Sequence, residues 1–209
     1  LPATRTVTFA ALKPGLLLAD GAELAGEVEL VDIGLDMSSA RAWRVTAADV
    51  AGWLPEPDRS AHKWRSAVWI VAGSPGMTGA ARLASESALR SGAGYVRLST
   101  PGAGVDVDAP VEAVVTALPA EGWAAAVVAG LDRFRALAVG PVIGLDEATA
   151  EQVRSLVASA PVPTVVDGDG LRALGAAADA VIGARDGGPS VVLTPHDGEF
   201  AALDGAAPE

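Results

Sequence analysis

From residue 67 onward, short apolar runs alternate with longer stretches rich in alanine and leucine. The apolar runs stand at 67–72, 95–99, 136–139, 162–166 and 190–194. Buried strands of a parallel sheet read as continuous apolar runs because helices cover both of their faces. The alternation therefore predicts an α/β fold, in which a mainly parallel sheet carries helices on both faces.

The stretches between these runs predict the helices. One helix begins at Thr78 or Gly79 and ends near Arg90, where glycines follow. A second is capped by Asp146 and ends near Ser159. A further helix and a further strand are expected at 123–134 and 111–117.

The first part of the chain has a different character. Residues 5–34 predict two short strands with a turn at 13–15 between them. A segment this short cannot bury a core, so we expect it to pack on something else. The stretch 45–64 is polar and contains prolines, which predicts a connector.

Composition excludes several functions. The formal net charge is −11, which opposes general binding to nucleic acid or to an anionic membrane. The chain has no cysteine, so it has no disulfide or thiolate metal site, which fits a reducing cytoplasm. No run approaches the roughly 20 apolar residues of a membrane span.

Candidate ligand-binding residues follow the carboxyl ends of the strands, where open α/β sheets bind ligands. The turn after the first strand carries Gly73, Gly76 and Gly79 ahead of a helix. Glycines allow close backbone approach, and the amides at a helix N-terminus suit an anion. A tight strand-to-helix turn without a ligand is the alternative. The spacing matches neither the dinucleotide fingerprint nor a P-loop.

Two acidic residues and a histidine follow later strands. Asp167 and Asp169 can orient a hydroxyl or bind Mg²⁺ through water, or they can cap the next helix. His196 precedes Gly198 and Glu199, and is either a hydrogen-bonded structural residue or a ligand contact. No HExxH or paired-histidine pattern occurs, so no metal site of that kind is expected.

Taken together and in order, these motifs resemble the ADP-dependent NAD(P)H-hydrate dehydratase family of the ribokinase-like superfamily. The resemblance spans about 60–204, and residues 5–34 resemble the last strands of an NAD(P)H-hydrate epimerase domain, of Rossmann-like type, which bacteria often fuse ahead of the dehydratase. It implies an epimerase remnant at 1–42 and the first two-thirds of a dehydratase domain at 43–209. The segments that carry it are His62-Lys63, 73–81, 88–94, Gly140-Pro141, 166–171 and 193–199.

The resemblance implies a repair reaction. Such enzymes remove water from the S epimer of hydrated NADH or NADPH with ADP, by phosphorylating the ring hydroxyl and releasing phosphate, while the epimerase interconverts the R and S forms. Substrate contacts of the family fall on Ala80, Gly144 and His196. The resemblance also implies Mg²⁺ and a homo-oligomer. The residues expected to shape and line the pocket are Gly73, Gly76, Gly79, Gly140, Asp167 and Asp169.

Departures from the family pattern bear on activity. Val142 stands where the family has a glycine, and a β-branched side chain obstructs a positive φ angle. Gly168 and Gly170 replace alanines, and Asp197 replaces a proline and adds a negative charge near a pocket for polyanions.

The family's late Gly-Asp motif, which carries the base, does not occur before Glu209. We therefore expect an inactive fragment with an unassigned catalytic residue, able to associate with the remainder of its protein. The alternatives are a ribokinase-like kinase of a small alcohol or vitamin precursor, or a nucleotide-binding fragment without turnover.

Overall fold

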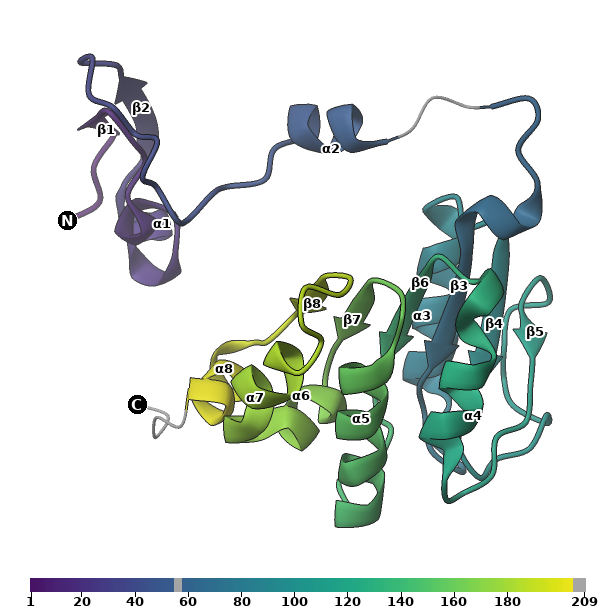
Figure 1. Cartoon of the computed structure of the whole chain (residues 1–209). Helices are drawn as coiled ribbons and strands as arrows, with labels where there is room; N and C mark the ends of the chain where they lie inside the picture. Colours follow the sequence, from purple (N-terminus) through teal and green to yellow (C-terminus); the bar gives the residue numbers. More distant parts are fainter. Residues whose placement is uncertain (55–57, 205–209) are drawn as a thin grey trace. The chain divides into compact units, whose positions relative to one another are not determined.

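A computed structural model describes residues 1–54 and 58–204 (Figure 1). The chain divides into two compact units, Leu1–Pro57 and Asp58–Glu209. This division falls later in the chain than the boundary between 42 and 43 that the resemblance implies, which stays a prediction. Within the described ranges, no helix is both long and apolar enough to cross a membrane.

The second unit is built on a six-stranded sheet in the order β5-β4-β3-β6-β7-β8, with every pair parallel. The chain adds strands on one side of β3 and then returns to place β6 on its other side. The strand order therefore reverses between β3 and β6, and such a reversal opens a crevice at the carboxyl ends of the two strands. The strands are β3 Ala67–Val71, β4 Tyr95–Ser99, β5 Val114–Val115, β6 Ala136–Val139, β7 Thr164–Val166 and β8 Val191–Leu193.

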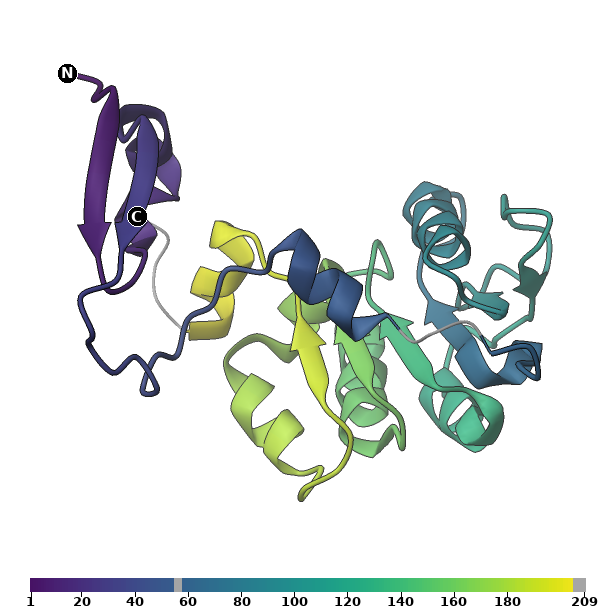
Figure 2. The same ribbon diagram turned by 90° about the horizontal axis from the view of Figure 1, so that it is seen from above.

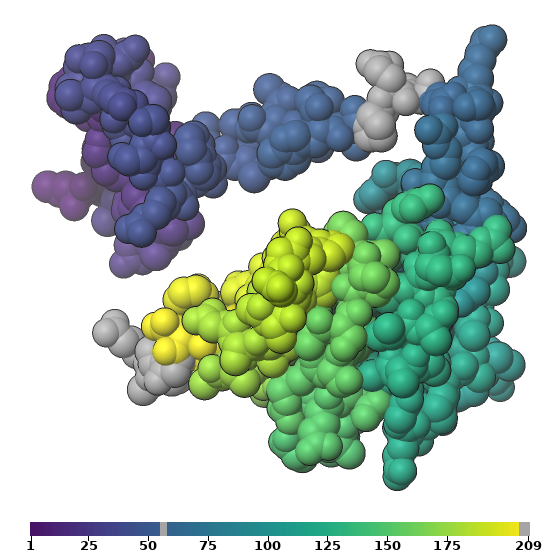
Figure 3. All heavy atoms as spheres, in the orientation of Figure 1, coloured from purple at the N-terminus to yellow at the C-terminus, as the bar shows by residue number. Residues whose placement is uncertain are grey.

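Helices cover both faces of this sheet, as the alternating pattern predicted (Figure 1, Figure 2). Helix α3, Gly79–Arg90, packs on one face against β3 and β4. The opposite face carries α4 Trp123–Ala129, α5 Glu147–Ser159, α6 Asp169–Leu174 and α7 Ala178–Gly183, whose atoms close over the strands in Figure 3. Helix α8, Asp197–Asp204, follows β8 and packs on α6. The 3₁₀ segments are η2 Lys63–Ser66, η3 Leu131–Arg133 and η4 Gly175–Ala177.

The larger core lies under α4, α5 and α6. Trp69, Leu137 and Val139 point from the sheet into this layer, where they meet Val153 and Leu156 of α5, and each of the five is at most 3% exposed. Burial of side chains of this size stabilises the fold by about 1.5–3 kcal/mol each. This layer therefore fixes the strands whose ends form the candidate site.

The α3 face is covered only in part. Helix α3 packs on β3 and β4, and the sheet beyond them leaves Val165 of β7 and Val192 of β8 37% and 53% exposed. Both side chains alternate with buried or half-buried neighbours along their strands, so they stand on the α3 side.

Some predicted elements differ from the structure. The strand expected at 111–117 is reduced to two residues, and Val111 is 94% exposed. The helix expected at 123–134 ends at Ala129, because Gly130 follows and a 3₁₀ turn takes its place. Helix α7 was not predicted.

The first unit contains two parallel strands, β1 Arg5–Phe9 and β2 Glu27–Val31. The predicted simple turn is wrong, because parallel strands need a crossover connection. That crossover consists of η1 Pro14–Leu16 and α1 Ala19–Leu24. Val7, Phe9 and Leu30 are about half exposed, which agrees with the expectation that this segment buries no core of its own.

The predicted connector also contains a helix, α2 Ala47–Trp53. Thr46 and Asp49 form a capping box: the Thr46 hydroxyl accepts from the Asp49 amide, and the Asp49 carboxylate accepts from the Thr46 amide at 2.8 Å. This reciprocal pair starts a helix that apolar periodicity did not reveal. Part of the connector, 55–57, lies outside the described residues.

Candidate functional site

The candidate site begins at the turn after β3. Gly73 has a φ of +77°, and its amide donates to the carbonyl of Pro141, 2.8 Å away, in the turn after β6. A Cβ on Gly73 would lie 3.1 Å from the Met77 carbonyl oxygen and 3.2 Å from Ala81. The positive φ and these tight contacts together favour glycine where the two turns meet on either side of the strand-order reversal.

The same turn delivers the N-terminus of α3. Hydrogen bonds between Ser74 and Met77 close it, so the tight-turn reading is correct as a description of shape. Thr78 is the N-cap residue but makes no side-chain cap bond. The first-turn amides, from Gly79 to Ala81, have no acceptor within the helix and stand at its positive end. This arrangement can hold an anion.

The turn after β6 packs against the turn after β7. A Cβ on Gly140 would lie 2.1 Å from the carbonyl oxygen of Asp167, so these backbones touch. Val142 has a φ of +54°. The backbone thus keeps the left-handed conformation that a glycine would adopt, although a β-branched side chain disfavours it. Gly144, with a φ of +115°, donates its amide to the Asp169 carboxylate at 3.1 Å.

The two aspartates hold neighbouring turns together. The hydroxyl of Thr194, just after β8, donates to Oδ1 of Asp167 at 2.6 Å. The Asp169 carboxylate holds the turn after β6 through Gly144. Gly168 is the N-cap residue of α6 and that helix has no side-chain cap bond, so the capping role considered for the aspartates is wrong.

A hollow of about 350 Å³ lies on the α3 side of these strand ends. Its wall is almost entirely apolar apart from Asp167 and Thr194. It is lined by Ala84, Ala138, Val139, Pro141, Val165, Asp167 and Thr194.

His196 lies at the start of α8 and caps it. Its Nδ1 accepts from the amides of Gly198 at 3.1 Å and Glu199 at 3.4 Å. The Glu199 carboxylate in turn accepts from the His196 amide at 3.1 Å. The histidine therefore has the structural role considered from the sequence. Its side chain is 67% exposed, so the ring also remains open to a ligand.

The structure brings most of the predicted residues into one row. Gly73 bonds to the turn of Gly140, Gly144 bonds to Asp169, and Asp167 bonds to the strand end that precedes His196. A Cβ at Gly76 or Gly79 would meet open space, so these two glycines line the loop without packing against the other turns.

Sequence reasoning gave no role to Thr194 or Ser74. Thr194 joins the turns after β7 and β8, and only its place at a strand end hinted at this. The Ser74 hydroxyl is buried without a hydrogen-bond partner in the described part of the chain, beside the α3 turn. No sequence signal distinguishes it from an ordinary turn serine.

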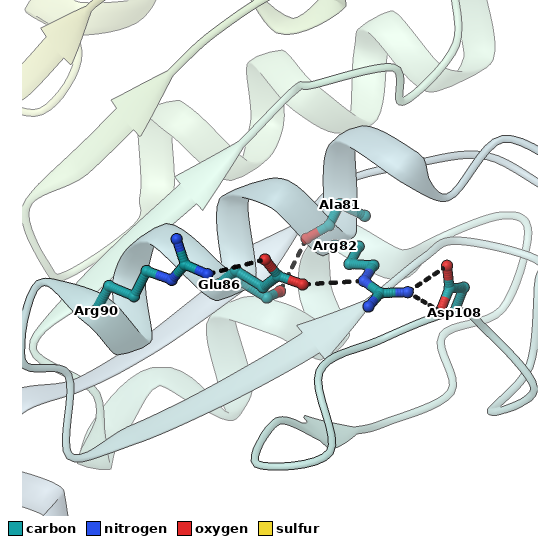
Figure 4. Close-up of polar contacts among 6 residues, drawn as sticks. Ala81, Arg82, Glu86, Arg90 and Asp108 are labelled. Atoms are coloured by element: carbon teal, nitrogen blue, oxygen red, sulfur yellow. Dashed lines mark hydrogen bonds and ion pairs between the residues drawn. The ribbon is translucent and has the colours of Figure 1, made fainter.

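A second hollow, about 600 Å³, contains none of these residues. It lies along α3, where Arg82 donates to both carboxylate oxygens of Asp108 at 2.7 and 2.9 Å and to Glu86 at 3.0 Å (Figure 4). These bonds raise the pKa of Arg82, that with Asp108 most. Arg82 thus ties α3 to the loop after β4, and we assign this hollow a structural role.

Comparisons with a family model and with curated relatives point to one family, and they show how much of the relatives' length this chain covers. Residues 68–209 match the family model of NAD(P)H-hydrate dehydratase. The bifunctional NAD(P)H-hydrate repair enzyme of Moorella thermoacetica is 38% identical over 220 residues, covering 98% of this chain and 41% of that relative. The same enzyme of Mycobacterium tuberculosis H37Rv is 38% identical over 207 residues, covering 99% and 40%. The chain thus spans about two fifths of the length of these relatives.

Solved structures agree with this assignment. The ADP/ATP-dependent NAD(P)H-hydrate dehydratase from Bacillus subtilis, co-crystallized with ATP/Mg²⁺, superposes with a TM-score of 0.59 at 32% identity, covering 77% of this chain and 55% of that one. A ribokinase-like superfamily protein from Enterococcus faecalis has a TM-score of 0.55 at 18% identity over 71% of this chain and 51% of its own, which shows the fold alone. The second unit therefore has the ribokinase-like fold, and the chain belongs to the NAD(P)H-hydrate dehydratase family.

Proposed function

We propose that the second unit forms the substrate side of an enzyme that uses ADP to dehydrate the S epimer of NAD(P)H hydrate. One observation carries this proposal: the uncapped N-terminus of α3 adjoins the glycine turn after β6, at the strand-order reversal of a chain in the hydrate dehydratase family. The relatives' name, bifunctional repair enzyme, supports a second activity in the whole protein. We assign residues 1–42 to its epimerase domain and 43–209 to its dehydratase domain.

In this proposal Ala80, Gly144 and His196 contact the hydrate. The α3 amides, one of which belongs to Ala80, stabilise phosphate charge. Gly144 is held in place by Asp169, so its backbone is preorganised for a ligand. Four glycines shape the pocket, because without side chains they leave room for a ligand beside the backbone: Gly73, Gly76, Gly79 and Gly140. Asp167 and Asp169 line the pocket.

In this reaction the residues of the site would position the two reactants and stabilise the negative charge of the phosphoryl group. Transfer of the terminal phosphoryl group of ADP to the ring hydroxyl, with AMP as the leaving group, requires the two reactants in line. Loss of inorganic phosphate and a ring proton then restores the dihydronicotinamide. The amides of α3 oppose the negative charge that develops on the transferred group. We assign no residue of this chain to the role of general base.

The residues present fit a nucleotide-borne Mg²⁺. Among the described residues, no group of three His, Cys, Asp or Glu side chains is placed to hold a metal alone. Mg²⁺ commonly binds through one or two carboxylates together with substrate phosphates, and it neutralises phosphate charge. Asp167 uses Oδ1 and Asp169 uses Oδ2 in the bonds described, so the other oxygen of each carboxylate would be the one to hold such an ion.

We also propose a cytoplasmic protein that self-associates, without nucleic-acid or membrane partners. The lack of cysteine supports a cytoplasmic location, and the net charge of −11 opposes nucleic-acid and membrane partners. Self-association is supported by the half-exposed apolar side chains of the first unit, Val7, Phe9 and Leu30.

Calorimetric titration with ADP and with the S epimer of NADH hydrate tests the site. Ala80→Asp places a carboxylate among the α3 amides, and we expect it to weaken binding of the hydrate roughly tenfold or more. Ser87→Asp adds the same charge at an exposed position of the same helix and serves as the matched control. Equal affinities for the two variants would show that the α3 N-terminus does not hold the hydrate.

A turnover assay tests the reaction. Recovery of dihydronicotinamide absorbance from the hydrate is followed with ADP and then with ATP, in this chain and in a full-length relative. Phosphorylation of an added alcohol without any recovery would favour a ribokinase-like kinase instead.

A further inference from the structure

Glu199 is a buried carboxylate that the proposed chemistry does not use. It is 8% exposed, and acidic side chains are almost never buried unless they are paired. Its Oε2 accepts from the backbone amide of His196 at 3.1 Å, and its Oε1 lies 3.5 Å from Nε2 of the same residue. Both oxygens of the buried group therefore face one histidine.

The other ring nitrogen of His196 points the opposite way. Nδ1 accepts from the amides of Gly198 and Glu199. A ring nitrogen that accepts a hydrogen bond carries no proton, so the neutral ring carries its proton on Nε2. The Glu199 carboxylate beside Nε2 favours a proton at the same place. The backbone of α8 and the buried carboxylate thus select one tautomer.

We propose that Glu199 is a positioning residue that fixes His196 as an Nε2–H donor, and that this donor serves an uncharged oxygen of the ligand. The His196 side chain is 67% exposed and that of Glu199 only 10%, so Nε2–H is the polar group of this pair that meets the ligand. Glu199 and Asp197 add negative charge around it, which opposes a phosphate at this position. This inference rests on the proposed function, under which the oxygen belongs to the nicotinamide end of the hydrate, as its hydroxyl or carboxamide.

Nuclear magnetic resonance tests the tautomer without any ligand. The chain has two histidines, and His62→Gln leaves only His196. Two-bond ¹H–¹⁵N correlations then report which ring nitrogen carries the proton. We expect Nε2–H in the wild-type background. In Glu199→Ala the ratio of tautomers should shift roughly fivefold toward Nδ1–H, because the carboxylate charge 3.5 Å from Nε2 is lost.

Two further variants separate positioning from general destabilisation. Glu199→Gln keeps an oxygen that accepts from the His196 amide, but it places an uncharged NH2 donor beside Nε2, so we expect the ratio to shift toward Nδ1–H as in Glu199→Ala. Glu151→Ala removes an exposed carboxylate from α5 and should leave the ratio unchanged. An Nδ1–H ring in the wild-type background, or an unchanged ratio in Glu199→Ala, overturns the positioning role.

Ligand titrations test the acceptor. The S epimer of NADH hydrate should move the Nε2–H resonance, whereas inorganic phosphate and ADP should leave it in place. A shift with phosphate or ADP as large as that with the hydrate overturns the assignment to an uncharged oxygen. A hydrate that does not bind refutes the proposed function together with this acceptor, while the tautomer of the ligand-free chain still decides the role of Glu199.

Discussion

Val142 provides the sharpest test of the backbone in the candidate site. Its φ of +54° places a β-branched residue in the left-handed region, and its half-buried side chain sits between two glycines of positive φ, Gly140 and Gly144. If the turn imposes this conformation, glycine should be preferred over alanine here, the reverse of the usual order.

The magnitude follows from two opposing effects. Alanine in the left-handed region costs about 1–2 kcal/mol, which glycine avoids. Glycine loses about 0.4–1 kcal/mol relative to alanine through its greater freedom in the unfolded chain. Both Val142→Gly and Val142→Ala remove the two methyl groups of the half-buried valine, so that loss cancels between them. We therefore expect Val142→Gly to exceed Val142→Ala in free energy of unfolding by about 0.5–1 kcal/mol, or about 2 °C in Tm.

Thermal unfolding of the full chain, followed by tryptophan fluorescence, measures this difference. Trp69 and Trp123 are 3% and 0% exposed, so their emission reports on the second unit. The matched control is the same pair of substitutions at Ser155, an exposed position inside α5, where alanine should be more stable than glycine by about 1 kcal/mol. If alanine is at least as stable as glycine at both positions, the positive φ at Val142 carries no strain and the reasoning is wrong.

Three other predictions concern the surrounding turns and clamps. Gly140→Ala should lower the free energy of unfolding by about 3 kcal/mol or more, because its φ is +121° and a Cβ would lie 2.1 Å from the Asp167 carbonyl oxygen. Gly79→Ala, whose Cβ would meet open space, should change the free energy of unfolding little. Denaturant titration of both variants checks this. Asp146→Ala should lower the Tm at neutral pH, and the difference from wild type should shrink as the pH falls below 3.8. The amide of Thr149 lowers the pKa of Asp146, so the carboxylate stabilises the fold above pH 3.8 and loses this effect as it is protonated in the folded state. A Tm difference that stays constant across the pH series would contradict this. Arg82→Met should speed hydrogen exchange in the loop around Asp108 without speeding that of Ser85 at the buried side of α3, as mass spectrometry of the exchanged peptides can show. Unchanged exchange in the loop would mean that the ion pair does not hold it.

Burial explains why the strands of the second unit could be predicted. Residues such as Ile70, Val71 and Leu137 are fully or almost fully buried, so an apolar run is required wherever such a strand passes through the core. The cap at Asp146 was equally readable, since its carboxylate accepts from the Thr149 amide at 2.9 Å. Both signals are local, and each is contained in the few residues that make it.

The crossover in the first unit could not be predicted in this way. Helix α1 contains Gly21, a poor helix former that reads as loop. A Cβ there would lie 1.7 Å from the carbonyl oxygen of Gly15, so the glycine is required by packing of the helix against the preceding turn. Local sequence carries no trace of this contact, and for that reason the parallel pairing of β1 and β2 was not predicted.

The candidate site shows the same division. Glycines at the strand ends were visible in the sequence, but the reason for Gly140 is the backbone of Asp167, 27 positions later in the chain. The reversal of strand order between β3 and β6, which brings Gly73 to Pro141, is likewise a property of the assembled sheet. The residue types in the sequence indicated a site at the strand ends, but only the folded structure shows which of these residues contact one another.

The charges at the two ends of this row give the site a direction. The uncapped N-terminus of α3 follows β3 and is positive, whereas Asp197 and Glu199 place negative charge after β8. Three strand spacings separate β3 from β8 in the sheet, about 14 Å. Under the proposed function, a dinucleotide with charged phosphates and an uncharged ring is favoured in one orientation, with phosphate toward α3 and the ring toward His196. Under the same proposal, the charge of Asp197 repels phosphate from the end where the ring is proposed to bind, and it therefore favours this orientation.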